Sequence, residues 1–508
     1  MVEYRVVSIV RDHARERGAA PALTGDGRTV TYAELDARSS RAAQGLRAAG
    51  LGHGSRVGYV GKNAPEFFDV LFGAAKLGAV VAPVNWRLTP EEITAIVEDT
   101  GAPVTVLDAE FADLASRLPG KVLVTGTAYE EWLAGHPAED PGFTGSPDDV
   151  VVQLYTSGTT GLPKGVQLTN ANFSVGERMA PRWGLDESSV SLVPMPLFHI
   201  GGTGWALAGL YSGCRQVLVR DIEPAALVET FERERITNAF IVPAVIQFMC
   251  QVPGAADRDY SALRAITYGA SPITSEVLRR ALETFKAPLF QLYGMTETTG
   301  AIVQLDPEDH DPEGPRRHLM RSAGRPYDWV ELKIVDPATG TERAPGETGE
   351  LLVRSSQNTV GYWNRPEETA ALFTEDGWLR TGDAGHIDAE GYLFLTDRIK
   401  DMIVTGAENV YPIEVEEVLA SHPDVADVAV IGVPDERWGE TVKAVVVPRP
   451  GSSPSEEEIL EYAKERLAGF KRPRSVDFVD ALPRNPSGKI LKKELRAPYW
   501  KGLGRTIG

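Results

Sequence analysis

The sequence contains very little cysteine. Only two of its 508 residues, Cys214 and Cys250, are of this type. Two cysteines cannot build a disulfide framework, and they argue against a metal site made of thiolates. Such a composition fits a reducing compartment, and we expect a cytoplasmic protein.

Positive charge is also in short supply. The chain has 52 lysines and arginines against 71 aspartates and glutamates, which gives a formal net charge of −19. A surface with this excess of negative charge repels nucleic acid, because nothing offsets the phosphates. Small anions held in a local basic pocket remain compatible with it, so we expect small-molecule partners and no nucleic acid.

Long uninterrupted apolar segments are missing as well. The longest stretch without a charged residue runs from 188 to 214 and could span a bilayer by length. Pro194, Pro196, His199 and Gly201-Gly202 interrupt it, so we expect a buried strand, a loop and the start of a helix, with no integral membrane association. Neither end of the chain resembles a targeting signal: the N-terminus lacks a secretory pattern, and the final RTIG is not a peroxisomal address.

The pattern of helices and strands favours an α/β fold. A chain of 508 residues is expected to form two or three units. TYAE at 31–34 is a capping box that predicts a helix start. VGYV at 57–60 and VVAPV at 80–84 predict strands on either side of a helix at 65–79. Strands and helices alternate in this way to about residue 290, which predicts parallel-rich sheets covered by helices.

The sequence pattern changes after about residue 320. Short strands with alternating apolar residues and glycine or proline turns predict a small β-rich subdomain at about 320–399. A helix, two strands and a further helix then follow. We therefore expect a large N-terminal domain at 1–399 and a small α+β domain at 401–508.

Residues 155–166 read YTSGTTGLPKGV and follow a predicted strand. Successive glycines allow backbone N–H groups to converge on phosphate oxygens, while the hydroxyls add donors and the lysine adds a charge. The loop differs from a Walker motif, because Lys164 precedes Gly165 instead of a serine or threonine. By itself a loop of this composition is more often a plain surface turn. The candidate phosphate-binding residues are Thr156, Ser157, Gly158, Thr159, Thr160 and Lys164.

The loop resembles the phosphate-loop signature of the acyl-adenylate-forming family, which includes acyl-CoA synthetases, peptide-synthetase adenylation domains and luciferases. Further motifs follow in the family's order: PLFHIGG at 196–202, YGMTET at 293–298, TGD at 381–383, DRIKDMIVTGAENVYPIEVE at 397–416 and PRNPSGKI at 483–490. The resemblance therefore covers nearly the whole chain. It implies that the C-terminal domain is a mobile lid joined to the N-terminal AMP-binding domain by a hinge at Lys400.

The resemblance also implies ATP, Mg²⁺ and CoA as cofactors. In the first half-reaction a carboxylate attacks the α-phosphate of ATP, with Thr296 on that phosphate, Glu297 holding Mg²⁺ and Lys489 bridging the reacting oxygens. His199 would position the acyl carboxylate. The residues implied for the nucleoside are Gly269, Ala270, Ser271, Tyr293 and Gly294 around adenine, with Asp383 and Arg398 on the ribose.

In the second half-reaction the thiol of CoA replaces AMP. The glycine loop at Gly406 and Ala407 would line the pantetheine channel. The residues implied for the phosphates and adenine of CoA are Arg87, Phe470, Lys471 and Arg472, each of which is otherwise an ordinary solvated side chain.

The acyl site is predicted to be neutral, because no acidic residue occurs from Phe198 to Leu210. This favours a fatty or aryl acid over an amino acid and predicts an ATP-dependent acyl-CoA synthetase. One alternative is transfer of the activated intermediate to a carrier protein, an amine or another small nucleophile. Another is a nucleotide-binding scaffold without activity, which the presence of Glu297, Asp383, Arg398 and Lys489 disfavours. The sequence leaves the oligomeric state open, with a homodimer considered.

Overall fold

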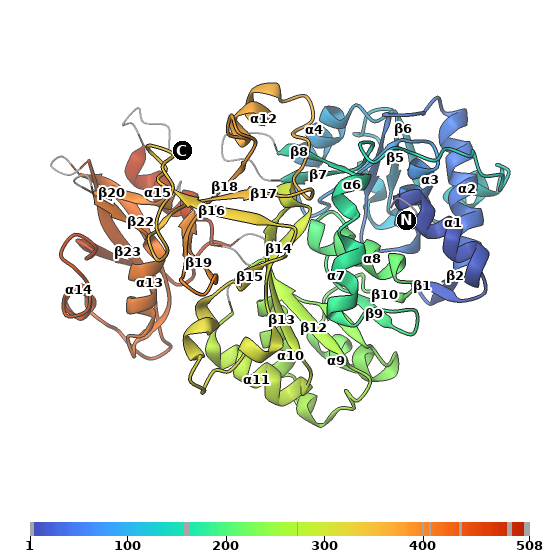
Figure 1. Cartoon of the computed structure of the whole chain (residues 1–508). Helices are drawn as coiled ribbons and strands as arrows, with labels where there is room; N and C mark the ends of the chain where they lie inside the picture. The colour runs from blue at the N-terminus through green and yellow to red at the C-terminus, as the bar shows by residue number, and fades with distance from the viewer. Residues whose placement is uncertain are drawn as a thin grey trace. The chain divides into compact units, whose positions relative to one another are not determined.

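The computed structural model of the chain describes residues 5–156, 163–271, 273–398, 401–405, 408–435, 439–484 and 490–501. The chain forms two compact units (Figure 1). The first consists of Met1–Glu331 and Arg354–Leu379, and the second of Leu332–Val353 and Arg380–Gly508. Each is described separately below. The domain boundary expected at residue 400 stays a prediction.

The larger sheet of the first unit contains nine strands in the described part of the chain, in the spatial order β15-β14-β13-β12-β11-β9-β10-β1-β2. Its central pairs from β10 to β13 are parallel, as predicted from the alternation of strands and helices. Figure 1 traces this alternation in green and yellow. The strands are β1 (Pro21–Gly25), β2 (Arg28–Thr31), β9 (Val190–Val193), β10 (Arg215–Leu218), β11 (Asn238–Phe240), β12 (Ala265–Gly269), β13 (Leu289–Met295), β14 (Gly300–Leu305) and β15 (Arg325–Pro326).

The smaller sheet of this unit has the order β6-β5-β3-β4-β7-β8. Its strands are parallel from β6 to β7, and an antiparallel hairpin of β7 and β8 forms the edge. The strands are β3 (Arg56–Val60), β4 (Val80–Val84), β5 (Val104–Leu107), β6 (Lys121–Val124), β7 (Val150–Thr156) and β8 (Lys164–Thr169).

The helices of the first unit begin where local sequence signals place them. The side chain of Thr31 accepts a hydrogen bond from the N–H of Glu34, whose carboxylate accepts in return, so the predicted capping box is confirmed. Thr89 and Glu92 form a second box. The helices are α1 (Val6–Arg17), α2 (Tyr32–Ala48), α3 (Pro65–Ala75), α4 (Pro90–Thr100), α5 (Thr127–Ala134), α6 (Asn170–Phe173), α7 (Gly176–Met179), α8 (Ile200–Tyr211), α9 (Pro224–Arg233), α10 (Pro243–Gln251), α11 (Ser275–Phe285) and α12 (Pro366–Leu372).

The interrupted apolar stretch at 188–214 folds as predicted into a buried strand, a loop and a helix, β9 and α8. The indole N–H of Trp205 in α8 donates to the carbonyl oxygen of Leu192 in β9 at 3.0 Å, which anchors α8 to the strand that precedes it. Within the described ranges, none of the helices combines the length and the apolar character needed to cross a membrane.

The second unit contains two further sheets. One has the order β16-β17-β18-β19, and the other has the order β21-β20-β23-β22 with β24 beside β23. The strands are β16 (Glu331–Val335), β17 (Gly349–Arg354), β18 (Leu379–Ile387), β19 (Leu393–Arg398), β20 (Ile403–Thr405), β21 (Glu408–Val410), β22 (Val425–Asp435), β23 (Gly439–Pro448) and β24 (Ser475–Phe478). The helices are α13 (Pro412–Ala420), α14 (Glu456–Lys464) and α15 (Lys492–Trp500). The predicted fold class, α/β with a small α+β unit at the C-terminal end, is confirmed.

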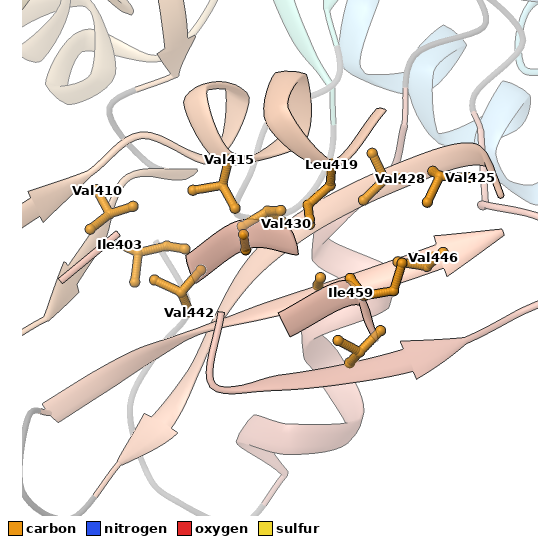
Figure 2. Packing of buried hydrophobic residues seen from close by; sticks show 13 residues of the cluster. Ile403, Val410, Val415, Leu419, Val425, Val428, Val430, Val442, Val446 and Ile459 are labelled. Carbon is orange, nitrogen blue, oxygen red and sulfur yellow. The ribbon is translucent and has the colours of Figure 1, made fainter. Parts of the chain in front are cut away.

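The core of the second unit lies between its helices and the β20–β24 sheet. Figure 2 shows aliphatic side chains from α13 pointing at those of β22 and β23. Most of them are β-branched, which suits a pleated surface. The buried members are Ile403, Val410, Val415, Leu419, Val425, Val428, Val430, Val442, Ala444, Val446, Ile459, Ala463 and Val476.

This core yields a stability prediction. Leu419 has no accessible surface, and replacing a buried leucine by alanine costs about 2–5 kcal/mol. We expect Leu419→Ala to accelerate hydrogen exchange of the β22 and β23 amides, measured by mass spectrometry. Glu417→Ala, on the exposed side of the same helix, should exchange like the parent chain. Unchanged exchange in Leu419→Ala would show that this cluster does not support the sheet.

Candidate nucleotide and acyl site

The predicted adenine residues meet at one edge of the larger sheet. β12 and β13 are parallel, with Gly269 opposite Leu292. Gly269, Ala270 and Ser271 therefore leave β12 beside the end of β13 that carries Tyr293 and Gly294. The carboxyl edge of parallel strands is where ligands bind in open α/β sheets.

Glycine is required at two positions of this edge, because a neighbouring backbone lies too close to leave room for a Cβ atom. A Cβ on Gly294 would lie 1.8 Å from the carbonyl oxygen of Gly300, and one on Gly269 would lie 2.3 Å from that of Leu292. Ala270 has a φ of +67°, a left-handed conformation that costs energy for a residue with a side chain and is concentrated at functional sites. The chain thus holds a strained, tightly packed turn where the adenine strip is predicted.

Thr296 and Glu297 lie in a single turn of 3-10 helix, Thr296–Thr298, between β13 and β14. The Glu297 side chain is largely buried, with 6% of the residue's surface exposed. The hydroxyl of Tyr362 donates to its Oε1 at 2.9 Å. Burial and the adjacent Glu297 carboxylate raise the pKa of Tyr362, so the phenol keeps its proton and remains a donor.

The phosphate loop is framed by the β7–β8 hairpin of the smaller sheet. Thr156 and Lys164 form the cross-strand pair at the end of β7 and the start of β8. The ammonium of Lys164 lies 5.1 Å from the ring centre of Tyr362, within cation–π range. The predicted residues Ser157, Gly158, Thr159 and Thr160 lie outside the described residues.

Residues 355–365, here called the bridging segment, connect the two parts of this site. On the side of the smaller sheet, Trp363 N–H donates to Gly165 O at 2.7 Å, and Gln167 N–H donates to Gly361 O at 3.0 Å. On the side of the larger sheet, Thr359 N–H donates to Glu297 O at 2.7 Å. The segment therefore fixes Glu297 relative to the β8 strand that carries Lys164.

A second set of contacts anchors the bridging segment through Asp99, at the end of α4. Asp99 accepts hydrogen bonds from Tyr155 Oη at 2.8 Å and from Arg365 at 2.7 Å. Its carbonyl oxygen accepts the indole N–H of Trp363 at 3.0 Å. No sequence motif predicts a role for this segment. Its only local signal was the glycine followed by two aromatic residues, Tyr362 and Trp363, in an otherwise polar stretch.

His199 lies immediately before α8, with its ring 4.5 Å from that of Phe198. The guanidinium carbon of Arg87 lies 5.8 Å from the Phe198 ring, so a predicted CoA residue is a neighbour of the predicted acyl motif. The His199 residue is exposed at the protein surface, and the nearby protein atoms together with the charge of Arg87 lower its pKa to about 4. A ring with so low a pKa is a weak base, which suits positioning rather than proton transfer.

The start of α8 is apolar and adjoins the turn that carries Glu297. Gly300, which follows that turn, has the Cγ1 atom of Ile200 3.5 Å from its Cβ position. A Cβ on Gly201 would lie 2.8 Å from the Phe240 ring. The acid-free sequence around α8 therefore supplies apolar surface beside Gly300, which follows the turn that carries Glu297.

The predicted ribose residues are cross-strand partners in the second unit. Asp383 of β18 is opposite Arg398 of β19 in an antiparallel pair. The N–H of Asp383 donates to the Thr381 hydroxyl at 3.0 Å, which fixes the backbone that carries the carboxylate. The side chain of Arg398 lies outside the described residues, as do Lys400, Gly406, Ala407 and Lys489.

The remaining predicted CoA residues form a surface loop of the second unit. The Phe470 residue is 39% exposed. Lys471 forms an ion pair with Glu414 at 2.5 Å, and Arg472 Nε donates to Leu467 O at 2.8 Å. A bound phosphate would therefore compete with Glu414 for Lys471. The assignment of these residues to CoA stays a prediction.

The oxygen ligands in the first unit fit a magnesium ion bound together with a nucleotide. Among the described residues, no three histidine, cysteine, aspartate or glutamate side chains form a metal cage. Glu297 provides one buried carboxylate, and Thr296 precedes it in the same turn. Mg²⁺ is commonly bound by one or two carboxylates with substrate phosphates completing its shell, so Glu297 is a suitable ligand.

Comparison with known proteins agrees with these features. The family model described as "AMP-binding enzyme" matches residues 10–363, and "AMP-binding enzyme C-terminal domain" matches residues 414–489. The chain is 41% identical over 505 residues to the fatty acid–[acyl-carrier-protein] ligase ScoC of Streptomyces coeruleorubidus, covering 97% of this chain and 96% of that protein. It is 39% identical over 491 residues to a feruloyl-CoA synthase of an Amycolatopsis species, covering 96% and 97%.

A solved structure, ATP-bound MatB from Rhodopseudomonas palustris, superposes with a TM-score of 0.89 at 29% identity and covers 99% of both chains. The chain belongs to the AMP-binding enzyme family and is an acyl-adenylate-forming ligase. The predicted resemblance is confirmed.

The low pKa of His199 gives a prediction. An unperturbed histidine gains its proton near pH 6.5, whereas the His199 ring, with its pKa at about 4, should stay neutral from about pH 6 to 8. The imidazole NMR resonance that disappears in His199→Gln should therefore keep a constant shift over this range in the parent enzyme. A titration midpoint near pH 6.5 would contradict the assigned environment.

Proposed function

We propose that this enzyme is an ATP-dependent acyl-CoA synthetase for an apolar carboxylic acid, either a fatty or an aryl acid. The observation that carries this proposal is the apolar, acid-free start of α8, which adjoins the turn bearing Thr296 and Glu297. A carboxylate held there has apolar surface for its tail and phosphate-binding groups at its head. His199 precedes the first turn of α8, where the helix dipole also favours an anion.

The first half-reaction joins two anions, so the residues around it must offset charge and fix geometry. A carboxylate oxygen attacks the α-phosphorus, the bond to the β-phosphate oxygen breaks, and pyrophosphate leaves with its electron pair. Thr156, Lys164 and Thr296 are proposed to hold the phosphates, and Asp383 the ribose hydroxyls. Glu297 would hold Mg²⁺, which when bound neutralises part of the phosphate charge.

In the second half-reaction a thiolate sulfur attacks the acyl carbon. The C–S bond forms, the C–O bond of the mixed anhydride breaks, and AMP departs. CoA is the proposed acceptor, with the cationic loop around Phe470 as its proposed surface. A carrier protein is the alternative, because ScoC, at 41% identity, carries a name that specifies such an acceptor. Both acceptors present the same phosphopantetheine thiol.

The proposed substrate class can be tested by pyrophosphate release across fatty, cinnamic, benzoic and dicarboxylic acids. We expect apolar monocarboxylates to exceed dicarboxylates in kcat/KM by roughly 100-fold or more, because a second carboxylate would be buried without a charged partner. Thioester products with CoA and with a phosphopantetheinylated carrier protein are then identified by mass. A preference for dicarboxylates would overturn the proposed substrate class. Thioester formed only on the carrier protein would overturn CoA as the proposed acceptor.

Lys489 is proposed to act only in adenylation, where its ammonium would bridge the carboxylate and phosphate oxygens. Loss of such a contact costs roughly 3–4 kcal/mol, or about 100- to 1,000-fold in rate. We expect Lys489→Ala to lose pyrophosphate release by this factor and still convert supplied acyl-adenylate to thioester. Lys493→Ala, an exposed lysine nearby in sequence, is the matched control. An equal fall in both half-reactions would contradict a role confined to adenylation.

A further inference from the structure

Tyr362 contacts both Glu297 and Lys164. We propose that Tyr362 is a positioning residue for metal-bound ATP: it orients the Glu297 carboxylate toward the divalent ion and holds Lys164 beside it. This inference rests on the proposed function, because it takes Glu297 as the magnesium ligand. It adds a residue of the bridging segment to the proposed reaction.

The backbone of Tyr362 is fixed before its side chain reaches the site. Tyr362 forms an antiparallel bridge with Val166 of β8. Its N–H donates to the hydroxyl of Thr369 at 2.9 Å. Gly361 has a φ of +130°, and a Cβ there would lie 2.4 Å from Thr369 Cγ2, so only glycine permits this turn. The ring therefore projects from a fixed backbone position that is bridged to β8, the strand that carries Lys164.

The hydroxyl of Tyr362 determines how Glu297 is oriented. Glu297 Oε1 accepts this hydrogen bond at 2.9 Å, and its own backbone oxygen accepts from Thr359 of the same segment at 2.7 Å. Two contacts from one segment, one to the carboxylate and one to the backbone, restrict rotation about the side chain. Hydrogen bonds to a metal-ligating carboxylate orient it, and their loss commonly weakens metal affinity or activity about 10- to 100-fold.

The aromatic face of Tyr362 contacts the ammonium group of Lys164. Lys164 Nζ lies 5.1 Å from the ring centre, where the ring quadrupole attracts a cation. One residue thus places a carboxylate for the metal ion and an ammonium for the phosphates. Tyr362→Phe separates the two effects, because it removes the hydrogen bond to Glu297 and keeps the ring that faces Lys164.

The experiment is a titration of the full-length enzyme with Mn²⁺, in place of Mg²⁺, in the presence of the non-hydrolysable nucleotide AMPCPP. Free Mn²⁺ is measured by electron paramagnetic resonance, so no acid substrate is needed. We expect Tyr362→Phe to weaken Mn²⁺ binding about 10- to 100-fold, with metal-free AMPCPP affinity within about twofold of the parent because the ring beside Lys164 remains. Tyr32→Phe is the matched control: it removes the buried hydroxyl of a tyrosine in α2, which donates to Cys214 O at 2.9 Å, and this variant should bind Mn²⁺ like the parent.

Glu297→Gln distinguishes failure of this inference from failure of the proposed function. If Glu297→Gln binds Mn²⁺ like the parent enzyme, Glu297 is not the metal ligand and the proposed site itself is wrong. If Glu297→Gln is impaired while Tyr362→Phe matches Tyr32→Phe, only the positioning role is wrong. Tyr362→Phe could also lose affinity for metal-free AMPCPP as strongly as it loses affinity for Mn²⁺. That result would indicate a general structural role for Tyr362 and would overturn the positioning role.

Discussion

Hydrogen bonds from the bridging segment hold together the two sheets on which the candidate nucleotide site depends. The phosphate-loop hairpin belongs to the six-stranded sheet, and Glu297 lies in the turn between β13 and β14 of the nine-stranded sheet. Residues 355–365 bond to Gly165 and Gln167 on one side and to Glu297 on the other. Phosphate and metal ligands must be placed to a fraction of an ångström to act together. In this fold that precision comes from a short irregular segment, since neither sheet contains both groups.

The charge distribution of the site is adapted to a reaction between two anions. The chain carries a net charge of −19, so positive charge has to be placed locally. Lys164 contacts the Tyr362 ring, and Arg87 contacts the aromatic rings of Trp86 and Phe198. Aromatic contacts hold these two cations without neutralising them, which leaves their charge available to a ligand. His199 is kept neutral by its surroundings, so its ring can lie beside Arg87 without repulsion.

The elements of this fold could be predicted because their signals are local. A capping box at Thr31, the alternation from β3 to β13 and the proline and glycine breaks within 188–214 each depend on a few adjacent residues. The candidate site was predicted from motifs whose residues are close in sequence, such as Thr296 and Glu297. Tyr362 was not found, because its partner Glu297 is 65 residues away and a Gly-Tyr-Trp stretch predicts only a buried aromatic pair. The contact between Arg87 and the Phe198 ring was missed for the same reason.

The identity of the acceptor is a different kind of question from the identity of the reaction. The residues proposed for adenylation lie on paired strands and tight turns, which tolerate little change: a Cβ on Gly294 alone would overlap the Gly300 carbonyl. The predicted acceptor surface is an exposed loop, where Phe470 and Lys471 can be replaced without disturbing a core. Relatives of nearly equal identity, 41% and 39%, accordingly carry names with different acceptors, a carrier protein and CoA. Similarity over the whole chain thus supports a shared adenylation reaction, while the acceptor is proposed to depend on a few surface side chains, which contribute little to overall identity.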